Sequence, residues 1–219
     1  MAKGLAAIVL ALGLGAGAAA GEWQVLGIGG GGGMFTPAAS PHDPGLMLMS
    51  CDMSGSYRSL DGGKHWEMIH WSQLHSSRGC RPLFTPEAIY WVCGGELRGS
   101  RDKGKTWTPV VAGAAPWTGP PTHLAASKSS LFVGTDSGLW RSPDGGKTWA
   151  ACHKGKCYAV LALGPKVHAS IDLNYLVSGD DGATWDLVKV PLFDGRGFQA
   201  LAGGGTRLFG VVFKVGILK

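Results

Sequence analysis

The sequence predicts an all-β protein of the β-propeller type, and three observations support this fold class. Hydrophobic residues make up 45% of the 219 residues and charged residues 16%, a balance that suits a packed core and excludes a disordered chain. Glycine occurs 37 times between short apolar runs, as expected for many short strands joined by tight turns. An eight-residue pattern also recurs four times at nearly even spacing.

The recurring pattern is Ser-x-Asp-x-Gly-x-(Thr/His)-Trp, found at 59–66, 100–107, 142–149 and 178–185. Its tryptophans are separated by 41, 42 and 36 residues. A fixed period of this length is typical of a repeat architecture. We predict a structural role for the shared residues, which are Ser59, Asp61, Gly63, Trp66, Ser100, Asp102, Gly104, Trp107, Ser142, Asp144, Gly146, Trp149, Ser178, Asp180, Gly182 and Trp185.

Each repeat contains apolar stretches for four short antiparallel strands, which is the composition of a propeller blade. First strands are expected at 35–40, 81–85, 123–127 and 159–163, and second strands at 46–50, 88–92, 131–134 and 167–171. The third strand enters the pattern, and the fourth leaves its tryptophan, as at 66–69 and 107–111.

The pattern itself predicts a tight turn. The aspartates can accept hydrogen bonds from backbone N–H groups of their own turn, the glycines permit positive φ, and the tryptophans can bury their rings between sheets. Calcium binding is the alternative for the aspartates, but the loops lack the ligand array of a calcium loop. We therefore predict no metal site and no cofactor.

The two ends of the chain raise separate questions. Residues 1–20 combine Lys3, a short apolar run and Ala18-Ala19-Ala20, which predicts a signal peptide rather than a membrane anchor. Residues 21–219 would then form the propeller domain, secreted or periplasmic and without a membrane span. A fifth unit begins at 198–202 and 207–213 and reaches 215–219, where a fifth pattern would start. Either the chain is a fragment of a longer propeller, which we favour, or a strand at 23–28 closes five blades.

Export would permit disulfides among the five cysteines. Cys152 with Cys157 is the easiest pair, and Cys80 with Cys93 is a second possibility. An odd number leaves at least one cysteine without an intrachain partner.

Strand alternation predicts two ends for every blade. The repeated pattern lies at one end, here called the box end, and the turns between second and third strands lie at the other, here called the turn end. The turn end is expected to hold the carboxylates and rings that suit a carbohydrate, or a protein partner. These residues are Asp52, Asp136, Asp172, Trp71, His75, Arg78 and Trp117. As alternatives, the aspartates could simply form turns and the tryptophans could pack over blade edges.

The net charge of +5 is dispersed, which argues against nucleic acid as a partner.

The four patterns resemble the Asp-boxes, or bacterial neuraminidase repeats, of sialidases, sortilin-type receptors, photosystem assembly factors and xyloglucan-degrading glycosidases. That resemblance implies a propeller in which the box is a structural turn, and it leaves function undecided.

Residues 23–59 are similar to the start of xyloglucan-specific glycoside hydrolases, with a Gly-rich entry and an Asp-x-Gly-Gly-x-Tyr-Arg-type motif at Asp52 to Arg58. Ser54 replaces the first glycine of that motif. The resemblance implies that Asp52 is a catalytic base and that Arg58 belongs to the substrate site. Those enzymes invert and take their acid from a second propeller, which this chain lacks; Asp136 is a candidate in its place.

Two function classes therefore remain. One is a carbohydrate-active propeller related to these hydrolases, and the other is a non-catalytic binding or assembly propeller. Sialidase activity ranks third, because no Arg-Ile-Pro motif occurs and Arg58, Arg78 and Arg141 have no evident triad context.

Overall fold

The structure is a computed structural model and describes residues 32–77, 79–172, 174–189, 198–204 and 207–211. The predicted signal peptide at 1–20, the possible strand at 23–28, Arg78 and the segment 215–219 lie outside the described residues.

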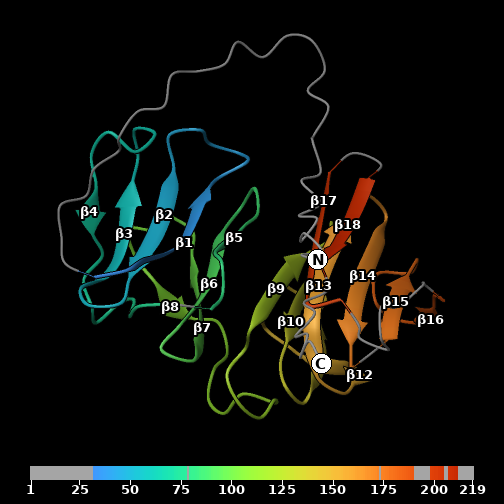
Figure 1. Cartoon of the computed structure of the whole chain (residues 1–219). Helices are drawn as coiled ribbons and strands as arrows, with labels where there is room; N and C mark the ends of the chain where they lie inside the picture. The colour runs from blue at the N-terminus through green and yellow to red at the C-terminus, as the bar shows by residue number, and fades with distance from the viewer. Residues whose placement is uncertain (1–31, 78, 173, 190–197, 205–206, 212–219) are drawn as a thin grey trace, which may run out of the picture.

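The described residues form four four-stranded antiparallel sheets and one two-stranded sheet, and they contain no helix. Within each four-stranded sheet, strands adjacent in sequence are adjacent in space, and the sheets follow in chain order from β1–β4 at the left to β13–β16 at the right (Figure 1). We refer to the sheets as blades 1 to 4. The two-stranded sheet stacks beside β13 of blade 4, where a fifth blade belongs.

Blade 1 consists of β1 (Met34–Ala39), β2 (Met47–Cys51), β3 (Gly55–Ser59) and β4 (Glu67–Met68). Blade 2 consists of β5 (Leu83–Phe84), β6 (Ile89–Cys93), β7 (Glu96–Ser100) and β8 (Thr108–Pro109). Blade 3 consists of β9 (His123–Ala126), β10 (Leu131–Gly134), β11 (Gly138–Ser142) and β12 (Ala150–Lys154). Blade 4 consists of β13 (Cys157–Leu163), β14 (Lys166–Ile171), β15 (Asn174–Ser178) and β16 (Asp186–Leu187), and the last sheet of β17 (Ala200–Gly204) and β18 (Arg207–Val211).

The predicted strands match the observed ones closely in blades 3 and 4 and less well at the sheet edges. β5 covers only Leu83–Phe84 of the predicted 81–85. Pro82 and Pro86 bracket it, and proline cannot donate to a strand ladder.

Three apolar cores lie between successive blades. The first joins Leu48 and Leu74 of the blade 1 side to Trp91 of blade 2. The second joins blade 2 to Val133 of blade 3, and the third joins Phe132 of blade 3 to β13–β15 of blade 4. Each sheet therefore buries its faces against its neighbours, as blades of a propeller do.

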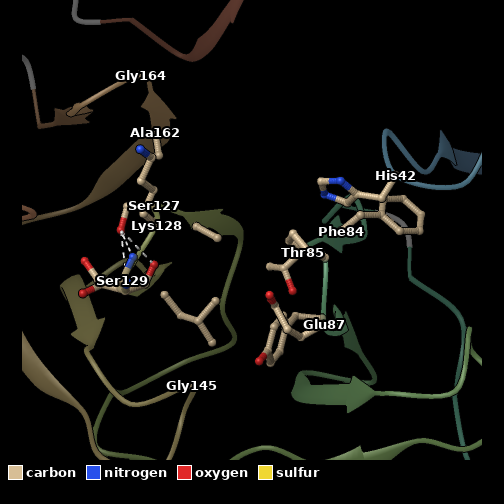
Figure 2. A pocket seen from close by; sticks show the side chains of 15 residues that line it. His42, Phe84, Thr85, Glu87, Ser127, Lys128, Ser129, Gly145, Ala162 and Gly164 are labelled. Atoms are coloured by element: carbon tan, nitrogen blue, oxygen red, sulfur yellow. Dashed lines mark hydrogen bonds between the residues drawn. The ribbon is translucent and has the colours of Figure 1, made fainter.

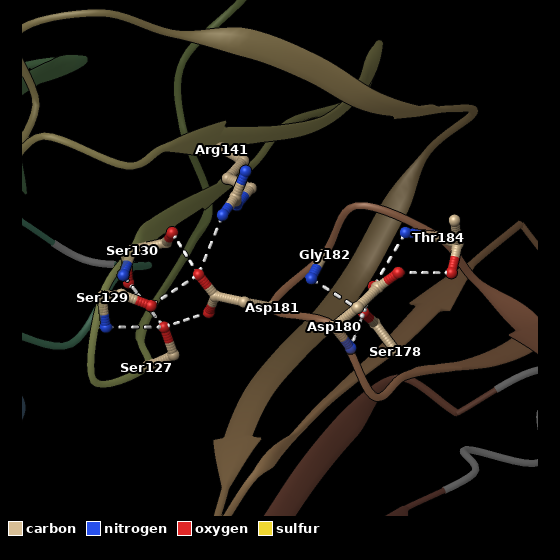
Figure 3. Close-up of polar contacts among 9 residues, drawn as sticks. All are labelled: Ser127, Ser129, Ser130, Arg141, Ser178, Asp180, Asp181, Gly182 and Thr184. Atoms are coloured by element: carbon tan, nitrogen blue, oxygen red, sulfur yellow. Dashed lines mark hydrogen bonds and ion pairs between the residues drawn. The ribbon is translucent and has the colours of Figure 1, made fainter.

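The four repeated patterns form the same hydrogen-bonded turn, shown for blade 4 in Figure 3. In blade 3, the Ser142 hydroxyl donates to Asp144 Oδ1 (2.8 Å) and accepts from the Gly146 N–H (2.7 Å). Asp144 also accepts from the Thr148 N–H (2.9 Å), and Trp149 Nε1 donates to the Gly146 carbonyl (2.9 Å). The aspartates thus accept backbone N–H groups of their own turn, as predicted.

Glycine is required at the fifth position of the pattern. Gly146 has a φ of +96°, and a Cβ there would come within 2.3 Å of Val110 Cγ1. The same position in blade 4, Gly182, has a φ of +87°, and a Cβ would approach Phe132 Cε1 to 2.6 Å. These turns therefore press directly against the preceding blade.

The residue at the fourth position of the pattern contacts the preceding blade when that residue has a side chain, as in blades 2 and 4. In blade 2, Lys103 Nζ forms an ion pair with Asp43 Oδ2 of blade 1 (2.8 Å). In blade 4, Asp181 Oδ2 accepts from Arg141 of blade 3 (2.9 Å) (Figure 3). The Asp181 carboxylate also accepts the hydroxyls of blade 3 residues Ser127, Ser129 and Ser130.

The proposed disulfides are absent, which corrects the cysteine prediction. Cys152 and Cys157 carry thiols that donate to the carbonyls of Leu139 and Ala159, respectively. The two residues belong to different sheets, β12 at an edge of blade 3 and β13 at the start of blade 4. Cys80 and Cys93 are also thiols, and burial raises the pKa of Cys80 to about 12.

Removing the seryl hydroxyl should destabilise the fold. Ser142 is fully buried, so Ser142→Ala leaves the Gly146 N–H without its acceptor. We expect a loss of about 1–3 kcal/mol in the free energy of unfolding, measured by urea titration. Thr118→Ala, at an exposed residue, is the control. Equal stability of the two variants would contradict the structural role of the hydroxyl.

Acid should weaken the same turns. Hydrogen bonds from Thr148 and Thr184 lower the pKa of Asp144 and Asp180, respectively, to about 2 from an ordinary value of 3.8. Their contribution is therefore complete above about pH 4 and is lost as pH falls towards 2. Melting temperature measured from pH 5 to pH 2 should decline in that window, and Asp144→Asn should show a shallower decline. If the melting temperatures of the unmodified protein and of Asp144→Asn declined in parallel, the Asp144 carboxylate would not be a source of the acid sensitivity.

Candidate functional site

Two of the three predicted carboxylates make the same structural contact at the turn end. Asp52 directly follows β2, and its Oδ1 accepts from the N–H of Gly33 (2.9 Å), while its own N–H donates to the Gly33 carbonyl (3.2 Å). Asp172 directly follows β14, and its Oδ1 accepts from the N–H of Lys156 (2.9 Å), while its N–H donates to the Lys156 carbonyl (2.8 Å). Both aspartates therefore tie the end of a second strand to the residue just before the first strand.

The third carboxylate, Asp136, lies in the β10–β11 turn and forms an ion pair with Lys156 Nζ (3.1 Å). The hydrogen bond to Asp136 raises the pKa of Lys156. The Lys156 ammonium also lies 5.4 Å from the centroid of the Tyr158 ring. Asp136 and Asp172 thus converge on one lysine between blades 3 and 4, whereas the contacts of Asp52 to Gly33 lie in blade 1.

Trp71 presents an exposed ring beside two histidines. It is 65% exposed, and its ring centroid lies 5.9 Å from that of His75 and 6.1 Å from that of His70. A Cβ on Gly94 in the β6–β7 turn would lie 3.2 Å from His75 Cδ2, so this ring cluster lies at the turn end of blade 2. All three side chains of this cluster are exposed to solvent.

The segment that carries Trp71 is held firmly. Leu74 is fully buried in the core between blades 1 and 2. The side-chain Oε1 of Gln73 accepts from the backbone N–H of Trp107 (3.0 Å). The backbone carbonyl of Gln73 accepts from the Arg98 guanidinium (2.8 Å). The exposed indole is therefore mounted on an anchored connection rather than on a loose loop.

Two predicted site residues lie elsewhere. Trp117 is only 8% exposed, and its ring packs edge-on against Trp149 (5.2 Å between centroids) and beside Trp140. It fills the core between blades 2 and 3, where a large apolar ring gains most from burial. Arg58 lies next to Ser59 at the box end, bonds Glu67 (2.6 Å), and has a 12% exposed side chain.

Sequence reasoning missed a cavity of about 530 Å³ at the box end (Figure 2). Its lining comes from the connections between first and second strands of all four blades. These include His42 of blade 1, Glu87 of blade 2, Lys128 of blade 3 and Gly164 of blade 4. The signal available was topological: if the boxes lie at one end, the first-to-second strand connections lie there too, and their polar residues can meet.

Within the described part of the chain, no group of three or more histidine, cysteine, aspartate or glutamate side chains could hold a metal ion. The same residues include no helix long and apolar enough to cross a membrane.

Comparison with known proteins places the fold. No family model and no curated protein matches the sequence. Among solved structures, a GH74 xyloglucanase from Xanthomonas campestris aligns with a TM-score of 0.59 and 20% identity over 78% of this chain and 33% of that one. YCF48 from Cyanidioschyzon merolae aligns with a TM-score of 0.57 and 16% identity over 78% of this chain and 60% of that one. A chain of the nidogen–laminin complex aligns with a TM-score of 0.59 and 12% identity over 81% of this chain and 71% of that one.

These neighbours are β-propeller proteins, and the likeness supports a propeller fold for this chain. At such low identity it shows fold alone. The chain spans about a third of the length of the xyloglucanase and 60% of that of YCF48.

Proposed function

We propose that this chain is an exported Asp-box propeller that binds carbohydrate at its turn end without hydrolysing it. The Asp-box assignment is supported by the common hydrogen-bonded turn of four repeats, in which each serine donates to its own aspartate. Export is supported by the sequence of residues 1–20 alone.

The observation that carries the non-catalytic assignment is the shared role of Asp52 and Asp172. Both carboxylates accept the N–H of the residue before a first strand, at 2.9 Å. A contact repeated in two blades is explained by blade construction, without any demand from a reaction. Asp136, the candidate acid, is ion-paired with Lys156, a poor setting for a group that must deliver a proton.

Carbohydrate is the proposed ligand because of Trp71. Its exposed ring can lie against the apolar face of a sugar, while the His75 ring and the Nε2 of His70 offer nitrogens to hydroxyl groups. The other ring nitrogen of His70, Nδ1, is engaged by the Ser72 hydroxyl (2.7 Å). The anchored segment beneath it means that little ordering is needed on binding.

Trp71→Ala should weaken binding of xyloglucan oligosaccharides by about tenfold, equivalent to ~1.4 kcal/mol, because the sugar loses its stacking surface. Isothermal titration calorimetry measures the effect. Leu60→Ala, which removes another exposed apolar side chain at the box end, is the matched control and should bind normally. Unchanged affinity for Trp71→Ala, or no binding by the parent protein, would count against the proposal.

An inverting glycoside hydrolase is the second candidate, favoured by the motif from Asp52 to Arg58 and by the fold likeness to the xyloglucanase. Asp52 would then activate a water as general base. The required acid would have to come from another carboxylate about 6.5–9.5 Å away.

The two candidates differ in what Asp52→Asn does. A hydrolase should lose roughly 10²–10⁴-fold in turnover on xyloglucan, since general-base catalysis contributes about that much. A binding propeller should show no turnover in either protein. Under either hypothesis Asp52→Asn and Asp172→Asn should lose thermal stability to a similar degree, because both variants weaken the contact to a first strand. Reducing-sugar release distinguishes the two candidates, and thermal melts test the shared structural contact.

A further inference from the structure

We propose that the box-end cavity is a second binding site, which takes a short peptide segment carrying one basic and one acidic side chain. The site lies at the opposite end of the blades from Trp71 and Asp52, so it does not depend on carbohydrate binding. Its lining, free charges and hydrogen-bonding groups together point to this ligand.

The cavity is an open cleft lined by residues of several blades. Its walls are the connections 84–87 and 126–131, with His42, Gly145 and Gly164 at its margins. A volume of about 530 Å³ is within the range of roughly 300–1,000 Å³ for small-molecule sites, which suits two or three amino-acid residues.

Opposite charges stand on opposite walls. Glu87 lies on the β5–β6 connection and Lys128 on the β9–β10 connection, and Figure 2 shows them on either side of the opening. Both are exposed. Among the described residues, no hydrogen bond or ion pair engages the Glu87 carboxylate or the Lys128 ammonium. Each charge is therefore available to a ligand group of the opposite sign.

Hydrogen-bonding capacity lines the space between these charges. The hydroxyls of Ser129 and Ser130 donate to Asp181, at 2.8 and 2.5 Å, so their oxygens present lone pairs as acceptors. Tyr90 is buried along its ring, and its hydroxyl makes no hydrogen bond to the described part of the protein. Peptide N–H and C=O groups can pair with these acceptors and with this hydroxyl, respectively.

The lining fits a peptide better than other ligands. A neutral sugar has no charge to offer either Glu87 or Lys128, and Tyr90 is only 7% exposed, which leaves little ring surface for stacking. A nucleic acid or another polyanion would meet repulsion from Glu87. Leu131 and Pro86 add apolar contact suited to side-chain methylene groups.

Two blocked tripeptides test the proposal, N-acetyl-Lys-Ala-Glu-amide and N-acetyl-Glu-Ala-Lys-amide, with binding measured by calorimetry. We expect at least one of them to bind. Replacing its lysine by norleucine, or its glutamate by glutamine, should weaken binding about three- to tenfold, as expected for loss of one partly screened charge pair.

Matched protein variants assign the two charges. Glu87→Gln should weaken binding of the tripeptide that carries both charges, but it should not weaken binding of the analogue with norleucine in place of lysine. Lys128→Gln should likewise weaken binding of that tripeptide but not of the analogue with glutamine in place of glutamate. The exposed residues Asp186 and Lys105 provide the controls Asp186→Asn and Lys105→Gln, which should bind like the unmodified protein.

Three results would overturn the proposal: neither tripeptide binds, the losses do not depend on the matching charge, or xyloglucan oligosaccharides displace the peptide. Trp71→Ala separates this site from the carbohydrate proposal, because it should leave peptide affinity unchanged whether or not the protein binds sugar.

Discussion

Every blade depends on one buried seryl hydroxyl that both donates and accepts within the repeated turn. In blade 3, Ser142 receives the Gly146 N–H and gives its own hydrogen to Asp144, which in turn collects the Thr148 N–H. The turn thus provides partners for backbone groups that the sheet cannot pair, at the point where the third strand passes into the fourth. Because the turn is the same in each repeat, it also sets which connections lie at the box end and which lie at the turn end.

The variable fourth position of the turn contacts the preceding blade in blades 2 and 4, where it carries a side chain. Lys103 and Asp181 each reach a residue of the preceding blade, and the Asp181 carboxylate gathers three serines and an arginine. In blade 3 this position is Gly145, where an added Cβ would meet nothing within 4 Å. Gly145 is among the residues that line the box-end cavity. Blade 4 departs from the other three turns at its tryptophan: no hydrogen bond joins the buried indole Nε1 of Trp185 to the Gly182 carbonyl, whereas its three counterparts bond the glycine carbonyl of their own turn.

The repeating part of the structure could be predicted from the sequence, because each copy of the pattern supports the interpretation of the other copies. Four copies of the pattern predicted four sheets, the strand order within them and the internal bonding of the aspartates. Features outside the period were harder. The burial of Trp117 depends on Trp140 and Trp149, which approach it only after blades 2 and 3 pack. Arg58 could have been placed at the box end, since it directly precedes Ser59. The cavity could not, because it joins loops separated by many residues and contains no motif.

The residue that follows each second strand shows which side chains the blades use for their own assembly and which remain available for binding. It is Asp52 in blade 1, Gly94 in blade 2, Thr135 in blade 3 and Asp172 in blade 4. Thr135 is fully buried and donates to the Gly138 carbonyl within its own turn (3.0 Å), while the two aspartates bond the residue before a first strand. Because the position tolerates three different residue types, the fold does not demand a carboxylate there. Where a carboxylate is present, its observed use is to fasten strands. Recognition is then better sought in groups that the blades do not need for their own assembly, and the exposed ring of Trp71 and the unengaged charges of Glu87 and Lys128 are such groups.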